Sequence, residues 1–385
     1  MKINLKNGEA ISFTKKFPMN IFEIQDTLDR LKIPDDKPIV QFKISEHDNM
    51  EFPFALCLRG FSADIYRLNL FAERLENLDF SEMTALKSLL KVNPESDFED
   101  ILKMTYGLDS VIIYPCSDCR ELGEAVIENE MIPELESCSD EVLALLDPEK
   151  VGQIMQEREG GVFINERYCV TSGYEPPDIN IEIGRPENCF FRLLIVPEEE
   201  KIEQARWISL PCESEITSDF CNGICLDFQS ALPNLKFDDT HKIGALNELA
   251  KSLTQLSHDD FVKLKAVMEA KNICEIAETF DCIEHLTEYE FDKNIPNQSE
   301  FGRNYLALNL PANFNNSILE NADLFDFGQE VLMHKKGEIT FYGAISGRGQ
   351  ELYSALTIEP EQQLEEDFEE DIEEDFEPEM GGISL

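Results

Sequence analysis

The sequence has few positive charges and lacks the patterns of several common protein classes. Lys and Arg number 33 against 78 Asp and Glu in 385 residues, a formal net charge of -45. No apolar run reaches the roughly 20 residues of a membrane-spanning helix, and the first residues lack the apolar core of a signal peptide. Basic patches with interleaved aromatic residues, typical of nucleic-acid binding, are also missing. We therefore expect a cytoplasmic protein that binds neither membrane nor nucleic acid.

Catalytic patterns are missing as well. The 5 histidines show no HExxH or paired spacing, and no nucleophile signature such as GxSxG accompanies them. The glycine-rich stretch at 343–349 lacks the Lys-Ser/Thr ending of a phosphate loop. With 78 acidic residues, any spacing of two carboxylates arises by chance. We expect no enzymatic activity and no cofactor.

The 11 cysteines are predicted to be reduced thiols, because they are scattered through a long chain without an export signal. Cys116 and Cys119 have the CxxC spacing of a metal knuckle or redox pair. A reactive thiol needs cationic neighbours, whereas the charges here are mixed. Cys221 and Cys225, with three residues between them, fit poorly as a second zinc pair. We predict no metal site, and binding of a metal by Cys116 and Cys119 is left open.

The negative charge is the strongest signal that is present. Duplex DNA carries one charge per about 1.7 Å of its axis, so 45 uncompensated charges correspond to about 75 Å of duplex. A field of this sign attracts positively charged proteins. Since 42% of residues are apolar, with 26 Phe among them, most of the chain is expected to fold. Charge alone leaves open the alternative that acidity only provides solubility or salt tolerance.

The chain contains an internal duplication. Segment 68–79 aligns with segment 246–257 without a gap, and leucine, asparagine and alanine recur at the same positions. Asp79 and Ser257 fall at equivalent N-cap positions, each three residues before an acidic residue. Apolar residues spaced by three and four follow each cap. Each copy therefore predicts a helical hairpin.

The match extends beyond the hairpins. Gly123 corresponds to Gly302 and Gly152 to Gly328, and each copy ends in a glycine-containing turn and a short apolar strand. A β-rich part precedes each hairpin, with alternating apolar residues, and Pro18 is aligned with Pro211. The predicted strands lie at 10–13 and 39–44 in the first copy and at 190–196, 206–211 and 223–228 in the second.

These observations predict an α+β fold. We expect an elongated chain of small α+β domains with an internal duplication, in which helical hairpins accompany short antiparallel sheets. The predicted divisions are a first unit at 1–165 with its hairpin at about 68–92, a linker at 166–188, a second unit at 189–357 and an acidic low-complexity tail at 358–385.

The tail has 13 acidic and no basic residues between Glu359 and Glu379. Apolar residues recur every four positions from Leu364 to Phe376, a spacing that places one stripe on a helix. We expect a segment that is disordered alone and folds against a partner, the alternative being a solvated tail. Its candidate partner-binding residues are Glu365, Glu366, Asp367, Glu369, Glu370, Asp371, Glu373, Glu374 and Asp375.

Four motifs of the second copy occur in the order and spacing of a known family. They are Trp207-Ile208-Ser209-Leu210-Pro211, Ile243-Gly244-Ala245-Leu246-Asn247-Glu248-Leu249-Ala250, Glu300-Phe301-Gly302-Arg303 and Leu324-Phe325-Asp326-Phe327-Gly328. Through them the second copy resembles the ArdA family of antirestriction proteins. The first copy resembles the same family more faintly, through 71–75, 121–123 and 147–152.

The resemblance implies a function. Members of this family are acidic, elongated, dimeric mimics of B-form DNA, encoded by mobile genetic elements, that occupy the DNA groove of type I restriction-modification enzymes. The doubling in one chain departs from the family, so we expect either a monomer with a pseudo-two-fold axis or a homodimer. Alternative functions are an acidic module that captures another basic DNA-binding protein, such as a nucleoid protein or a defence nuclease, and an enzyme using Cys116 or Cys119.

Acids three and four positions apart lie about 5 to 6 Å apart on one face of a helix. A row of such carboxylates can replace phosphates opposite Lys and Arg, the alternative for each residue being a solvated face. The candidate partner-binding acids of the first copy are Glu73, Glu76, Asp79, Glu82, Glu95, Asp97, Glu99, Asp100, Glu121, Glu124, Glu128, Glu130, Glu134 and Glu136.

Overall fold

The structure of the chain is a computed structural model. It describes residues 1–8, 11–47, 52–53, 55–178, 189–198, 200–310 and 323–347. The predicted tail, with its candidate acids from Glu365 to Asp375, lies outside the described residues. The same is true of residues 179–188 of the predicted linker.

The first copy begins with an antiparallel sheet in the order β2-β1-β3-β4. Ile3, Leu5 and Phe42 are buried between polar neighbours, because successive side chains of a strand point to opposite faces. They share one core with Leu28 of α1. The first strand was not predicted, although Ile3 and Leu5 alternate with polar residues. The elements are β1 (Lys2–Asn7), β2 (Ile11–Lys16), α1 (Ile21–Leu31), β3 (Ile39–Glu46), α2 (Ala55–Leu58) and β4 (Phe61–Asp64).

The predicted helical hairpin follows the sheet. It consists of α3 (Ile65–Asn77) and α4 (Phe80–Val92), and α5 (Phe98–Met104) comes next. Asp79 caps α4 as expected, because its side chain accepts a hydrogen bond from the backbone of Glu82 while the Glu82 carboxylate accepts one from the backbone of Asp79.

A third module completes the first copy. Its strands form a sheet in the order β5-β7-β6. Part of this sheet corrects the sequence prediction, since β7 lies inside the range assigned to the linker, with Tyr168 and Cys169 fully buried. Four residues are too few to reveal a strand by their alternation, although β7 forms a hairpin with β6 directly before it and pairs with β5 on its other side. The elements are β5 (Ile112–Tyr114), α6 (Cys119–Glu128), α7 (Asp140–Leu143), α8 (Pro148–Glu159), β6 (Val162–Ile164) and β7 (Arg167–Val170).

Among its described residues the second copy repeats the order of first sheet, helical hairpin and last module, without counterparts of α2 and β4. Its first sheet has the order β10-β8-β9 and its last the order β11-β13-β12. The elements are β8 (Phe191–Val196), β9 (Arg206–Leu210), α9 (Ser214–Asp219), β10 (Ile224–Ser230), α10 (Ile243–Leu253), α11 (His258–Ala270), α12 (Ile276–Glu284), β11 (Tyr289–Asp292), α13 (Gln298–Asn309), α14 (Phe325–His334), β12 (Glu338–Thr340) and β13 (Gly343–Gly347). Short 3-10 helices lie at Leu108–Ser110, Ile202–Gln204, Thr240–Lys242 and Leu286–Glu288.

Equivalent hydrogen bonds confirm the duplication. The Asn69 side chain accepts from the backbone N–H of Met19 at 2.6 Å and donates to its carbonyl at 3.1 Å. Asn247 makes the same pair with Cys212, at 2.9 and 3.0 Å. In each copy an asparagine of the hairpin therefore ties down the residue after the aligned proline. Strand orders match too, since β2-β1-β3 corresponds to β9-β8-β10 and β5-β7-β6 to β11-β13-β12.

Each copy also contains a helix pair that meets at glycines. A Cβ at Gly152 would lie 1.8 Å from the carbonyl oxygen of Cys119, and one at Gly328 would lie 1.9 Å from that of Gln298. Backbone contact of this kind requires glycine. The aligned glycines therefore hold α6 against α8 and α13 against α14.

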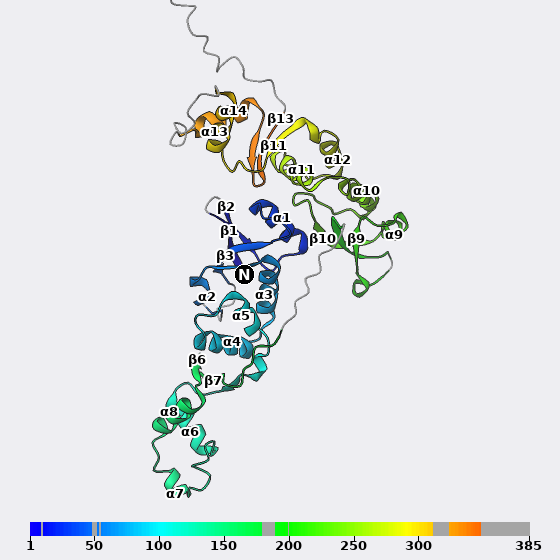
Figure 1. Cartoon of the computed structure of the whole chain (residues 1–385). Coiled ribbons are helices and arrows are strands. Elements are labelled where there is room, and N and C mark those ends of the chain that lie inside the picture. Colours follow the sequence, from blue (N-terminus) through cyan, green and yellow to red (C-terminus); the bar gives the residue numbers. More distant parts are fainter. Residues whose placement is uncertain are drawn as a thin grey trace, which may run out of the picture.

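The chain is elongated and bent, with α6 to α8 at one end and α13 and α14 at the other (Figure 1). The first sheet and α1 lie near the middle, where the β12–β13 hairpin points toward α1. At this seam the Lys265 ammonium lies 2.7 Å from a carboxylate oxygen of Asp29 and 3.6 Å from one of Asp26. The Tyr342 hydroxyl donates to Asp26 at 2.5 Å.

The seam joins unlike elements of the two copies. Asp26 and Asp29 belong to α1, whose counterpart is α9, whereas Lys265 belongs to α11, whose counterpart is α4. Under a pseudo-two-fold axis this contact would be accompanied by its counterpart, a contact between α4 and α9, but α4 and α9 lie well apart (Figure 1). The described seam is therefore heterologous, which corrects the expected pseudo-two-fold arrangement of the copies.

Candidate functional site

The candidate acids of the hairpin region begin on α3. Glu73 is exposed, accepts a hydrogen bond from Asn69 at 2.9 Å and lines a hollow shared with Arg192 of the second copy. Partial burial, with the nearby Glu76, raises the pKa of Glu73. Glu76 is exposed one turn further along the same helix. This edge of α3 therefore presents two carboxylates beside the seam.

Several candidate acids have structural partners. Asp79 and Glu82 form the capping box of α4, and Asp97 caps α5 by accepting from the backbone of Asp100 at 2.9 Å. Glu99 forms an ion pair with Arg67. These carboxylates hold helix ends or neutralise a cation, so their negative charge is partly used within the chain.

Glu134 forms an ion pair with Arg158. Arg158 donates to both of its carboxylate oxygens, at 2.8 and 2.5 Å. These hydrogen bonds lower the pKa of Glu134 to about 2. Glu134 is therefore ionised at any ordinary pH, but Arg158 cancels its charge at the surface.

Three candidate acids line one face of α6. Glu121, Glu124 and Glu128 are exposed, at spacings of three and four residues, which places them on one side of a helix. The same three residues border a surface hollow with Tyr114 and Cys116. Four further candidates, Glu95, Asp100, Glu130 and Glu136, are also exposed.

The α6–α8 module concentrates the charge. Residues 118–159 contain 13 acidic and 3 basic residues, a net charge of -10. The module has its own core, in which Leu122 and Val126 of α6 are fully buried. The face of α6 opposite its glutamates is thus fixed against α8, and the carboxylates are held on a rigid element. The structure brings the α6 acids together, whereas those of α3 lie beside the seam.

The two CxxC thiols are surrounded by unfavourable charge. Cys116 is 4% exposed, and burial, followed by Glu121 and Asp118, raises the pKa of its thiol. Burial also raises the pKa of Cys119, with Asp118 and Glu149 adding to the effect. Thiolate is the nucleophile and metal ligand, so both thiols are held in their less reactive form. No group of three or more His, Cys, Asp or Glu suited to a metal ion occurs among the described residues.

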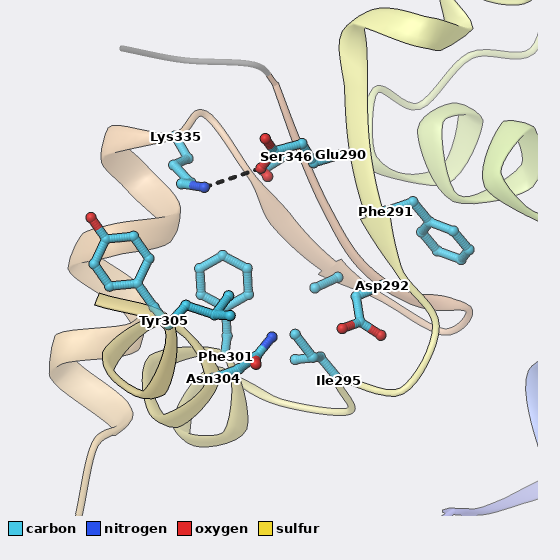
Figure 2. A pocket seen from close by; sticks show the side chains of 11 residues that line it. Glu290, Phe291, Asp292, Ile295, Phe301, Asn304, Tyr305, Lys335 and Ser346 are labelled. Atoms are coloured by element: carbon cyan, nitrogen blue, oxygen red, sulfur yellow. Dashed lines mark hydrogen bonds and ion pairs between the residues drawn. The ribbon is translucent and has the colours of Figure 1, made fainter. Parts of the chain in front are cut away.

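A third hollow lies between α13, α14 and the last sheet (Figure 2). Its lining side chains bind each other: Lys335 pairs with Glu290 at 3.0 Å and lies 5.6 Å from the centre of the Tyr305 ring. Asp292 accepts from the backbone of Asn294 at 2.9 Å. This arrangement orders the module.

Sequence reasoning missed the charged cluster of the seam. Asp26, Lys265 and Tyr342 are 3%, 2% and 2% exposed, and Arg30 joins them through Asp26 at 2.7 Å. One signal in the sequence could have indicated it: Lys265 is a charged residue that stands between two apolar residues of the predicted helix, Leu264 and Ala266. Its partners lie on α1, more than two hundred residues away, and only the fold brings them together.

We expect His258 to make folding stability depend on pH. Its imidazole lies 3.3 Å from Asp29, and the hydrogen bond to that carboxylate raises the pKa of His258. A raised pKa in the folded state adds stability below the ordinary histidine pKa, near 6.5. This stability is lost as pH rises through the higher folded value.

His258→Gln should therefore reduce the free energy of unfolding near pH 6 and change it little near pH 8.5. Because the His258 side chain is 66% exposed, solvent screening keeps the effect below about 1 kcal/mol. Urea denaturation of both proteins across this range measures it. Equal losses at both pH values would contradict the assignment to the charged imidazole.

No protein-family model and no curated protein sequence matches this chain. Among the described residues, no helix has both the length and the apolar character needed to cross a membrane.

Proposed function

We propose that the chain is a non-enzymatic DNA mimic that occupies the DNA-binding groove of type I restriction-modification enzymes and inhibits them in the cytoplasm. The main support is the α6 face, where Glu121, Glu124 and Glu128 project from a module of net charge -10. The module lies at one end of an elongated scaffold (Figure 1). The resemblance to ArdA proteins, given by the sequence motifs, points to the same function.

Rigidity makes these carboxylates useful as phosphate substitutes. The close contact of Gly123 with Gly152 fixes α6 on α8, so the carboxylates need no ordering of the backbone on binding. Preorganised groups bind more tightly because less entropy is lost. Contacts between such a row and Lys or Arg release counterions, so binding weakens steeply with salt.

We expect Glu121→Gln, Glu124→Gln and Glu128→Gln, combined, to weaken binding about tenfold or more at low salt. The slope of log K against log salt should fall by about one unit for each contacting carboxylate that is lost. The measurement is competition between the chain and duplex DNA for a purified type I modification complex, at several salt concentrations.

A matched variant separates a specific surface from the general field. Glu275→Gln, Glu278→Gln and Glu284→Gln, combined, remove the same charge from exposed positions of α12 and its N-cap in the second copy and should change binding little. Equal weakening by both triple variants would show that only net charge matters. Failure of the unaltered chain to displace DNA would overturn the proposal, and capture of a nucleoid protein or defence nuclease instead would favour the alternative function.

A further inference from the structure

The outer face of the β10-β8-β9 sheet is apolar at its centre. Trp207 of β9 pairs with Leu194 of β8, which also pairs with Asp227 of β10. In the neighbouring row Ile224 pairs with Val196. Trp207 is 41% exposed and Ile224 66% exposed. Both side chains point away from the core, because the alternate residues Leu193, Ile195 and Ile208 are buried beneath the sheet.

The same positions of the first copy are polar. By the equivalence of β2-β1-β3 with β9-β8-β10, the Trp207–Leu194–Asp227 row corresponds to Thr14, Asn4 and Lys43. The Val196–Ile224 row corresponds to Lys6 and Gln41. The apolar face is therefore a property of the second copy and is not required by the shared fold. Exposed apolar area of this kind commonly marks an interaction site.

The apolar face continues from the seam between the copies. Arg192, whose guanidinium lies 4.8 Å from the centre of the Trp207 ring, pairs with Gln229 in the next row of the sheet. Arg192 and Gln229 line one hollow together with Leu70 and Glu73 of α3. The first copy thus covers one end of the outer face and leaves the Trp207 end open.

We propose that this open face, centred on Trp207 and Ile224, is a docking surface for a cationic protein that contacts the α3 acids at the same time. Glu73 borders the hollow beside Arg192, and Glu76 lies one turn beyond. A partner with an apolar patch flanked by Lys or Arg matches both features. Another molecule of this chain matches less well, because each would bring a net charge of -45.

The inference rests on the proposed function and adds a contact that DNA does not offer. Salt screens charged contacts strongly and apolar contacts hardly at all. A mimic that buries a tryptophan against its target therefore keeps part of its affinity at salt concentrations that release DNA. Tryptophan is among the residues that contribute most to binding at interfaces.

The sole tryptophan of the chain provides a direct probe. In the experiment, 5-fluorotryptophan replaces Trp207, and an unlabelled purified type I modification complex is added while the fluorine resonance is recorded by NMR. Competition with duplex DNA is measured on the same samples. We expect the resonance to shift on binding. Trp207→Ser should weaken binding about tenfold or more at every salt concentration, with the slope against log salt unchanged.

Three further variants test whether the apolar face itself makes the contact. Trp207→Phe keeps an apolar ring and should retain most of the affinity, whereas Ile224→Ser should weaken binding as Trp207→Ser does. Met333→Ser removes an apolar side chain that is 72% exposed on α14 and should have no effect. Thermal melting by circular dichroism checks that each variant is folded.

The outcomes distinguish the two proposals. DNA displacement without a fluorine shift, and with normal binding of Trp207→Ser, would overturn the docking surface and leave the proposed function intact. Failure of the unaltered chain to displace DNA would overturn the proposed function and this partner together. A shift that depends on the concentration of the chain alone, with dimers in sedimentation, would assign the face to self-association instead.

Discussion

Lys265→Met is expected to lower the free energy of unfolding by about 3 to 5 kcal/mol, because it removes the buried cation that two buried carboxylates share. The Lys265 side chain is 1% exposed, and the side chains of Asp26 and Asp29 beside it are 4% and 8% exposed. Asp26 keeps Arg30 and Tyr342, whereas Asp29 keeps the His258 imidazole at 3.3 Å, so most of the loss falls on Asp29. Urea denaturation measures the change.

The same substitution should loosen the seam. Water can hydrate the Asp29 carboxylate only if α1 moves away from α11, which would separate the two copies. Small-angle X-ray scattering should therefore give a larger radius of gyration for Lys265→Met. Lys251→Met is the control, because its ion pair with Glu248 lies at the surface of α10 and contributes at most about 1 kcal/mol. Adding Asp29→Leu to Lys265→Met should restore much of the stability, since replacing a buried pair with apolar residues is often neutral.

Equal effects of Lys265→Met and Lys251→Met would contradict the role of the seam. A loss of stability without expansion would mean that the copies stay docked while one of them unfolds locally. These results bear on how the copies are held together and are independent of any partner.

Gly152→Ala should destabilise the α6–α8 module by more than about 3 kcal/mol, beyond the usual cost of overpacking. The added Cβ would lie 1.8 Å from the carbonyl oxygen of Cys119 and 3.0 Å from the backbone nitrogen of Gly123. Backbone atoms cannot rotate aside as a side chain does, so α6 and α8 must separate and expose their shared core. Thermal melting followed by circular dichroism reports the loss.

Gly244→Ala provides the matched control. Gly244 lies within α10, and a Cβ there meets nothing within 4 Å. Alanine is favoured over glycine in a helix by up to about 1 kcal/mol, so this variant should be as stable as the unaltered chain or more so. Similar destabilisation by both variants would indicate that helix propensity, and not contact between the helices, governs the response.

Loss of the α6–α8 contact should also weaken DNA competition. The glutamates of α6 would then sit on a helix that no longer has a fixed orientation. If Gly152→Ala proves destabilised but competes normally, the α6 acids do not carry the interaction, and the proposed surface must lie elsewhere on the chain.

Local patterns predicted the α+β fold and its duplication. The hairpins and their caps at Asp79 and Ser257 were predictable because a cap and an apolar stripe lie within one or two turns of helix. The aligned glycines were visible as matches, but their role was not. That role depends on two helices meeting, and α8 begins twenty residues after α6 ends.

The sequence alone determined the excess of negative charge, the duplicated order of helices and strands, and the spacing of the α6 glutamates. Only the tertiary structure decided which acids are paired with a cation, which copy exposes an apolar sheet face, and that unlike elements meet at the seam. The physical reason is distance along the chain. Charge and periodicity are properties of neighbouring residues, whereas Lys265 and Asp29, 236 positions apart, become partners only when two folded copies pack together.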